Sequence, residues 1–183
     1  TVITDSLMRI EYKESGEFVD SPTELVWFRN HPKPLFQVKE DSKYLQIETK
    51  FFRLQYEKGK SFEGTKFNPA QNLKIELKSS DRYWYYNHPE VRNYGTSDEL
   101  IESKNKKFKK GLYSGDGFVS IDDSKSLILG ENGELLKRET VGIDIYLFMY
   151  LKDFSECLRD YYMITGYPPL IPRYALGNWW SRN

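Results

Sequence analysis

Apolar and polar residues alternate in short runs over the first 150 residues, and this period of two is typical of half-buried β-strands. The alternation predicts strands at residues 8–12, 45–48, 52–56, 73–77 and 119–121. Further strands are expected at residues 24–28 and 35–38, the second beginning after Pro34. The run 143–151 is apolar or aromatic on both faces apart from Asp144, as in a strand at the centre of a sandwich.

Turn-forming residues separate these runs at the spacing of an antiparallel β-sandwich. The clearest turns lie at residues 14–16 and 57–60 and at the Asn132-Gly133 pair, for which we expect a type I′ hairpin. Residues 58–72 are polar and contain two glycines and one proline, so a long loop is expected there. The first 152 residues are therefore predicted to be mainly β.

The period changes to that of an amphipathic helix after Asp153. Apolar or aromatic residues then share one stripe, at Phe154, Cys157, Leu158, Tyr161 and Tyr162. Asp153 is the expected N-cap, and Gly166 followed by two prolines is expected to end the helix. Cys157 lies on the stripe and is interpreted as a small core residue.

Composition excludes several classes of function. The 27 basic and 27 acidic side chains give a net charge of zero, which argues against a nucleic-acid-binding protein. The single cysteine excludes a disulfide framework, and two histidines, each followed by proline, offer no histidine metal site; no cofactor is expected. Neither an apolar run long enough to span a membrane nor a signal peptide is visible, so we expect a cytoplasmic protein with no membrane partner.

Aromatic residues make up 16% of the chain and suit both sheet packing and sugar binding. Their densest cluster is Tyr83-Trp84-Tyr85-Tyr86, which we expect to pack in the core or at a sheet edge; a sugar-stacking platform is the alternative.

Adjacent carboxylates at Asp122 and Asp123 follow a predicted strand. Neighbouring side chains on an extended chain point to opposite faces, so the pair cannot supply both carboxyl groups of a glycosidase. We expect them to cap a turn instead. The chemistry of the residues alone predicts no catalytic apparatus.

Short motifs occur in a fixed order along nearly the whole chain. They are Phe18-Val19-Asp20-Ser21-Pro22-Thr23, Phe28-Arg29-Asn30, Asn93-Tyr94-Gly95-Thr96, Gly111-Leu112-Tyr113-Ser114-Gly115-Asp116-Gly117 followed by Asp122-Asp123-Ser124, the helix 153–165 with Gly166-Tyr167-Pro168, and Pro172-Arg173-Tyr174-Ala175-Leu176-Gly177-Asn178-Trp179-Trp180-Ser181-Arg182. In order and spacing this set resembles glycoside hydrolase family 31, the α-glucosidase and α-xylosidase family.

The resemblance implies an organisation in three parts. Residues 1–152 would form an N-terminal antiparallel β-sandwich of the galactose-mutarotase-like type, residues 153–172 a linking helix and proline-rich connector, and residues 173–183 the first strand of a truncated (β/α)₈ barrel. The family's retaining mechanism uses two aspartates well beyond that strand, so no catalytic residue is expected in this chain. It would be the non-catalytic N-terminal fragment of an enzyme that hydrolyses O-glycosyl bonds, with an α-linked oligosaccharide or glycoside and the downstream barrel as its partners.

The same resemblance implies residues that touch the sugar. Trp179, Trp180 and Asn183 lie near the end of the expected barrel strand, where such barrels place the active site. Asp98, in the 93–102 segment, is the expected ligand of a sugar hydroxyl. Asn183 occupies a position where the family often has an aromatic residue, and Gly115 occupies that of an arginine.

Two other classes of function remain open. The chain could be a free-standing carbohydrate-binding sandwich that uses residues 83–86, or a sandwich for protein–protein contact. The apolar stretch 176–182 discriminates among them, because a barrel enzyme needs this strand and a binding module does not.

Overall fold

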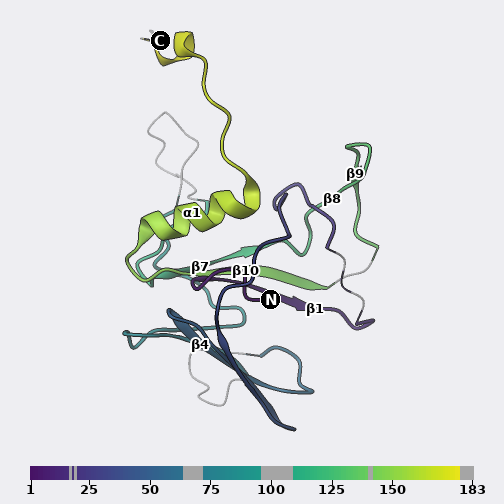
Figure 1. Cartoon of the computed structure of the whole chain (residues 1–183), viewed down its shortest axis with the longest axis vertical. Coiled ribbons are helices and arrows are strands. Elements are labelled where there is room, and N and C mark those ends of the chain that lie inside the picture. Colours follow the sequence, from purple (N-terminus) through teal and green to yellow (C-terminus); the bar gives the residue numbers. More distant parts are fainter. Residues whose placement is uncertain (17, 19, 64–71, 96–108, 140–141, 178–183) are drawn as a thin grey trace.

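The fold is mainly β, with antiparallel sheets and an α-helix near the C-terminal end (Figure 1). The computed structural model describes residues 1–16, 18, 20–63, 72–95, 109–139 and 142–177. The elements are β1 (Leu7–Tyr12), β2 (Gln37–Glu40), β3 (Tyr44–Glu48), β4 (Phe52–Glu57), β5 (Leu73–Leu77), β6 (Tyr83–Tyr85), β7 (Phe118–Asp122), β8 (Ile128–Leu129), β9 (Leu135–Leu136), β10 (Ile143–Met149), α1 (Phe154–Thr165) and the 3₁₀-helix η1 (Arg173–Leu176).

The strands form two larger sheets and one short hairpin. The first sheet has the order β1-β10-β7, and the second has the order β2-β3-β4-β5-β6. Every pairing is antiparallel, and in the first sheet Leu7 stands opposite Phe148 while Ile145 stands opposite Asp122. The predicted mainly β fold with antiparallel sheets and one helix is confirmed.

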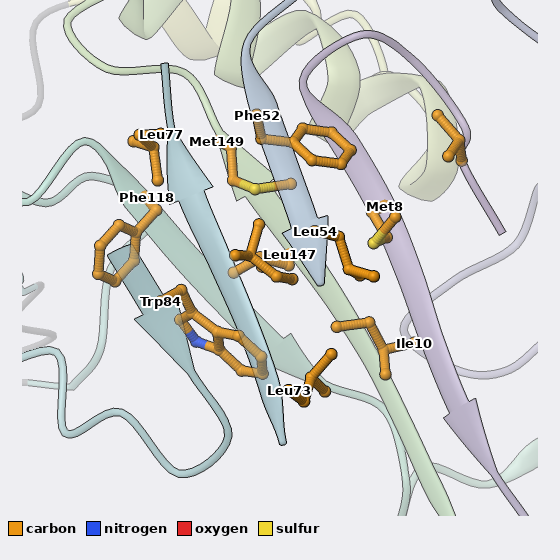
Figure 2. Close-up of a cluster of buried hydrophobic side chains, with 12 residues drawn as sticks. Met8, Ile10, Phe52, Leu54, Leu73, Leu77, Trp84, Phe118, Leu147 and Met149 are labelled. Carbon is orange, nitrogen blue, oxygen red and sulfur yellow. The ribbon is translucent and has the colours of Figure 1, made fainter. Parts of the chain in front are cut away.

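One hydrophobic cluster lies between the two sheets. Alternation places Phe52 and Leu54 of β4 inward, while Arg53 and Gln55 face solvent. Figure 2 shows side chains of both sheets meeting in this cluster, which includes Met8, Ile10, Phe52, Leu54, Leu73, Leu77, Trp84, Phe118, Leu147 and Met149. The two sheets are therefore joined through a shared apolar interface.

Helix α1 covers the opposite face of the three-stranded sheet (Figure 1). Cys157 and Ile164 of the helix pack in a second cluster with Tyr146 and Phe148 of β10. Because β10 touches one cluster on each face, almost all of its residues are apolar. This confirms both the buried central strand and the interpretation of Cys157 as a core residue.

Two predicted strands and one predicted turn differ from the structure, and the predicted run 143–151 is a strand only as far as Met149. Residues 24–28 form no strand; Thr23 makes only an isolated bridge to Ile128. The strand expected at 35–38 begins two residues later, at Gln37. The β8–β9 hairpin exists, but its turn is not type I′, because Gly133 has a positive φ of 81° and Asn132 does not.

The predicted helix ends are confirmed, but its buried stripe is rotated. Asp153 caps the start by accepting a hydrogen bond from the Glu156 amide at 3.0 Å, and Gly166 ends the helix with a φ of 91°. The buried residues are Cys157, Asp160 and Ile164, whereas Phe154 is exposed. The rotation arises because Asp160 accepts hydrogen bonds from the hydroxyls of Thr4 and Ser6, at 2.8 and 2.6 Å.

The strand expected from residue 173 is not formed where the structure describes it. Residues Arg173–Leu176 form the 3₁₀-helix η1, and their side chains are largely exposed. Among the described strands none pairs with this segment, so its backbone has no ladder to join.

The free edge of β7 is closed by two charged side chains. Ser120 donates its backbone N–H to Oε1 of Glu90 at 2.9 Å, and Nζ of Lys110 donates to the Ser120 carbonyl at 2.6 Å. These groups would otherwise be available to another strand, so the two side chains protect the edge from intermolecular pairing.

In the part of the chain that the structure describes, no helix has the length and apolar character needed to cross a membrane.

We predict that Phe52→Ala lowers the free energy of unfolding by about 3–5 kcal/mol, because it removes a fully buried ring from the cluster between the sheets. Leu35→Ala is the control: its side chain is 97% exposed, and its expected effect is below about 0.5 kcal/mol. Urea unfolding followed by Trp fluorescence measures both. Equal effects of the two substitutions would contradict this placement of the core.

Candidate functional site

The four residues predicted to contact sugar lie outside the described residues. Asp98 belongs to the stretch 96–108, and Trp179, Trp180 and Asn183 belong to 178–183. Their roles therefore stay predictions.

Five charged side chains that are largely buried form a group, here named the ion cluster: Arg9, Arg29, Asp123, Arg138 and Asp144. Arg9 of β1 holds Asp144 of β10 through two hydrogen bonds, Nε to Oδ1 at 2.8 Å and Nη2 to Oδ2 at 3.0 Å. Arg9 also forms ion pairs with Asp20 and with Glu11. This bidentate pair joins β1 to β10 in addition to the backbone hydrogen bonds between the two strands.

A second carboxylate, that of Asp123, completes the ion cluster. Arg29 approaches it at 2.7 Å and Arg138 at 3.0 Å, and both arginines also reach Asp144, at 3.4 and 3.2 Å. Thr23 donates its hydroxyl to the same carboxylate at 2.9 Å. Asp123 and Asp144 are both buried, so these hydrogen bonds and ion pairs replace the water that each carboxylate loses on folding.

The arginines around Asp144 favour its ionised form. Burial alone would raise the pKa of Asp144, but the hydrogen bond from Arg9 and the charges of Arg9, Arg29 and Arg138 outweigh it and keep the pKa below its usual range. A carboxylate saturated in this way is a poor proton donor or nucleophile. The ion cluster therefore stabilises the structure and does not form a catalytic pair.

The expected turn role of the two adjacent aspartates is correct for one of them. Asp122 is exposed and accepts a hydrogen bond from the Ser124 amide at 3.0 Å, as a turn cap does. Asp123 points to the other face, into the ion cluster, so the turn prediction is incomplete there. One sequence signal could have revealed the ion cluster. Asp144 is the charged residue within the apolar run 143–151, and a charged residue buried there needs a partner of opposite charge.

A second junction surrounds Asn93. Its Oδ1 accepts hydrogen bonds from the amides of Gly95 and Gly111, both at 2.8 Å, and its Nδ2 donates to the Gly111 carbonyl at 2.8 Å. Asn93 also bridges to Ser114, whose amide donates to the Tyr150 hydroxyl at 2.7 Å. One side chain thus holds together Gly95 and Gly111, which lie on either side of the stretch 96–108.

Two glycines near this junction have distinct surroundings. Gly117 has a φ of 77°, and a Cβ there would lie 2.8 Å from the Leu151 Cα, so no other residue fits. A Cβ at Gly115 would lie 3.3 Å from Nε of Arg92, and Arg92 also reaches Asp116 at 3.6 Å. A guanidinium is therefore present beside residue 115, supplied by Arg92 in a neighbouring turn.

Neither histidine forms part of a reactive set. The His88 ring packs on Tyr85 and Phe118, with centroids 4.7 and 4.9 Å away, and burial lowers its pKa. His31 is at the surface, with Nε2 2.8 Å from the Phe28 carbonyl oxygen.

Burial also raises the pKa of the Cys157 thiol. Within the described ranges no group of His, Cys, Asp and Glu side chains is placed to hold a metal ion.

The aromatic cluster at residues 83–86 packs as expected. Trp84 and Tyr85 are buried, and Trp84 lies in the cluster between the sheets (Figure 2). The alternative of a sugar-stacking platform made by this whole run is therefore wrong.

Exposed aromatic side chains gather instead in a groove between residues 27–28 and the last turns of α1. This aromatic groove has a volume of about 850 Å³ and is lined chiefly by Trp27, Phe28, Tyr162, Met163, Tyr167 and Pro169. Sequence reasoning missed it, since it assigned Trp27 to a strand and Tyr162 to a buried stripe.

Comparison with known proteins adds no identification: no family model matches the chain, and no curated protein matches it.

We predict that Asp123→Ala lowers the free energy of unfolding by about 3–5 kcal/mol, because it removes the nearer of the two carboxylates that pair with the buried Arg29 and Arg138. The matched control is its exposed neighbour, where Asp122→Ala is expected to cost about 1 kcal/mol or less. Chemical denaturation of both variants measures the difference. Similar losses would show that the charges of the ion cluster contribute little.

The lowered pKa of Asp144 predicts a loss of stability in acid. The unfolded-state pKa of an aspartate is about 3.9, so the stabilisation is fully present above that value and disappears as the pH falls through the lower, folded-state pKa. Urea midpoints measured from about pH 6 to about pH 2 should fall more steeply for the native chain than for Asp144→Asn. Parallel curves would contradict the assignment.

Proposed function

We propose that this chain is the N-terminal, non-catalytic β-sandwich module of a retaining α-glycosidase of the glycoside hydrolase family 31 type. The parent enzyme would hydrolyse O-glycosyl bonds of α-linked oligosaccharides or glycosides. In this proposal the module frames the sugar pocket, and a downstream (β/α)₈ barrel supplies the catalytic aspartates. The two antiparallel sheets around one shared core are compatible with such a sandwich.

The observation that supports the proposal is the meeting of the motif segments in space. Thr23 and Arg29, from two of these segments, both bind Asp123 of a third, about a hundred residues away. Asn93 binds Gly111 in the same manner, joining a fourth segment to the one that contains Asp123. Chance similarities scattered along a chain would not be expected to bond to one another through their polar members.

The Asn93 junction also gives the module a means of contributing to the pocket. Because the Asn93 side chain binds the amides of Gly95 and Gly111, the chain is held together on both sides of residues 96–108. In this proposal that anchoring lets the segment present one side chain reproducibly to a neighbouring domain. We assign Asp98 this role, as an acceptor for a sugar hydroxyl.

A free-standing carbohydrate-binding module is less well supported. That alternative relied on residues 83–86, and the burial of Trp84 and Tyr85 removes most of the platform. The described carboxylates of the ion cluster are engaged by arginine and offer no free ligand for sugar hydroxyls.

We predict that the longest natural polypeptide containing this chain hydrolyses aryl α-glucosides or α-xylosides and that residues 1–183 alone do not. Rate gains of roughly 10⁶-fold or more require a positioned nucleophile and acid, and the proposal places both in the barrel. Initial-rate assays on both proteins measure this. Turnover by the repurified 183-residue chain, or an inactive longer polypeptide, would contradict the proposal.

In the longer polypeptide, Asp98→Ala should raise KM or lower kcat/KM while leaving the melting temperature unchanged. Asp122→Ala is the control, because this exposed aspartate only caps a turn. Equal kinetics for the two variants would remove Asp98 from the pocket.

A further inference from the structure

The corner that follows β6 has a backbone that needs support. Asn87 and Glu90 both have positive φ, of 64° and 47°, although neither is a glycine. This left-handed region costs energy for a residue with a Cβ, so other contacts must hold the corner in place. His88 and Pro89 lie between the two residues. The corner is therefore a segment that relaxes when a contact holding it is lost.

The His88 ring supplies one of these contacts. The backbone N–H of Glu90 donates to Nδ1 of His88 at 3.0 Å, and the ring packs between those of Tyr85 and Phe118. Only a ring nitrogen without a proton accepts a hydrogen bond, and both nitrogens of a charged imidazolium carry one. The contact at Nδ1 therefore exists only while His88 is neutral.

Glu90 connects this corner to the free edge of β7. Its side chain is buried, and its Oε1 accepts hydrogen bonds from the N–H and the hydroxyl of Ser120, at 2.9 and 2.5 Å. Its Oε2 lies 2.8 Å from Nζ of Lys110, which also donates to the Ser120 carbonyl. Because backbone and carboxylate belong to one residue, a change in the backbone of Glu90 withdraws the carboxylate from Ser120.

Burial decides the charge of His88. Two carboxylates near the ring favour its charged form and one lysine opposes it; they are Glu90, Asp116 and Lys110. Asp116 is itself paired with Arg82 and Arg92, at 3.5 and 3.6 Å. The loss of water around the ring outweighs the carboxylates and lowers the pKa of His88. The neutral form therefore predominates at neutral pH, and the contact at Nδ1 is made.

We propose that His88 and Glu90 form a pH-sensitive latch that keeps the free edge of β7 closed at neutral pH and releases it in mild acid. Protonation of Nδ1 places a second donor against the Glu90 N–H, so the hydrogen bond is lost and the left-handed corner relaxes. The latch includes none of the residues assigned to the sugar pocket and does not depend on the proposed function.

The direction of the pH dependence follows from the lowered pKa of His88. A histidine in an open corner has the usual pKa of about 6.5, so opening favours uptake of the proton. The closed latch is therefore fully stable above about pH 6.5 and loses stability as the pH falls from there towards the lower pKa of the packed ring.

Hydrogen–deuterium exchange tests the latch in the longest natural polypeptide that contains this chain. Peptides that cover β7 and β4 are followed by mass spectrometry from about pH 7.5 to about pH 4.5, with labelling times scaled to the intrinsic exchange rate at each pH. We expect the protection of β7 to fall several-fold in acid and that of β4 to stay constant. The range ends above the usual pKa of aspartate, about 3.9, so the ion cluster keeps its charges.

Two substitutions assign the effect to one ring. In His88→Asn the amide oxygen takes the place of Nδ1 and accepts a hydrogen bond at every pH, so the protection of β7 should no longer depend on pH. His31→Asn is the matched control, since His31 lies at the surface. It should keep the several-fold fall of the native protein.

Three results would each overturn the latch: a fall of equal size in His88→Asn, a protection of β7 that does not change with pH, or an equal loss in β4. If His88→Asn does not fold, the native protein still decides. Exchange at the Cε1 hydrogen of His88 gives the pKa of that ring in the same protein. The opening of β7 must follow this titration, and a separate midpoint would overturn the proposal.

Discussion

Two carboxylates taken out of water, those of Asp123 and Asp144, impose the constraint on which this structure depends. Removing a charge from water costs several kcal/mol unless opposite charges and hydrogen bonds replace the solvent. Three arginines do so here, and they come from β1, from the irregular segment after β1 and from the segment before β10. Satisfying the two charges therefore strengthens the β1–β10 pairing and also fixes the segments of Arg29 and Arg138, which belong to no strand.

The irregular stretch between β1 and β2 shows how far this constraint extends. Thr23 and Arg29 are both bound to Asp123, and Val26 between them is buried in the cluster beneath α1. Because Thr23, Val26 and Arg29 are all held inward, the side chains of Trp27 and Phe28 face outward beside the end of α1. The aromatic groove is thus a consequence of the ion cluster, although the two share no side chain.

Local periodicity was enough to predict most strands and the helix, because each of those patterns depends only on which face of an element is buried. It could not predict the rotation of α1, since the buried Asp160 is explained only by hydroxyl partners at Thr4 and Ser6, some 154 to 156 residues away. Nor could it identify the ion cluster, because a charged side chain is usually solvated and its burial depends on distant arginines. The motif order indicated which segments matter, but only the structure shows that Thr23, Arg29 and Asp123 touch.

The two sheets differ in the sequence separation between the strands that pair. In the five-stranded sheet every strand pairs with its neighbour in sequence, whereas β1 pairs with β10, and Arg9 reaches Asp144 across 135 residues. Closing a longer loop costs more chain entropy, and such pairings form slowly. On the ribosome, the meander from β2 to β6 can assemble as it emerges, but β1 must wait for residues 143–149 to be made. Until that strand is made, Arg9 has Glu11 and Asp20 within reach but lacks the carboxylate that binds it through two hydrogen bonds.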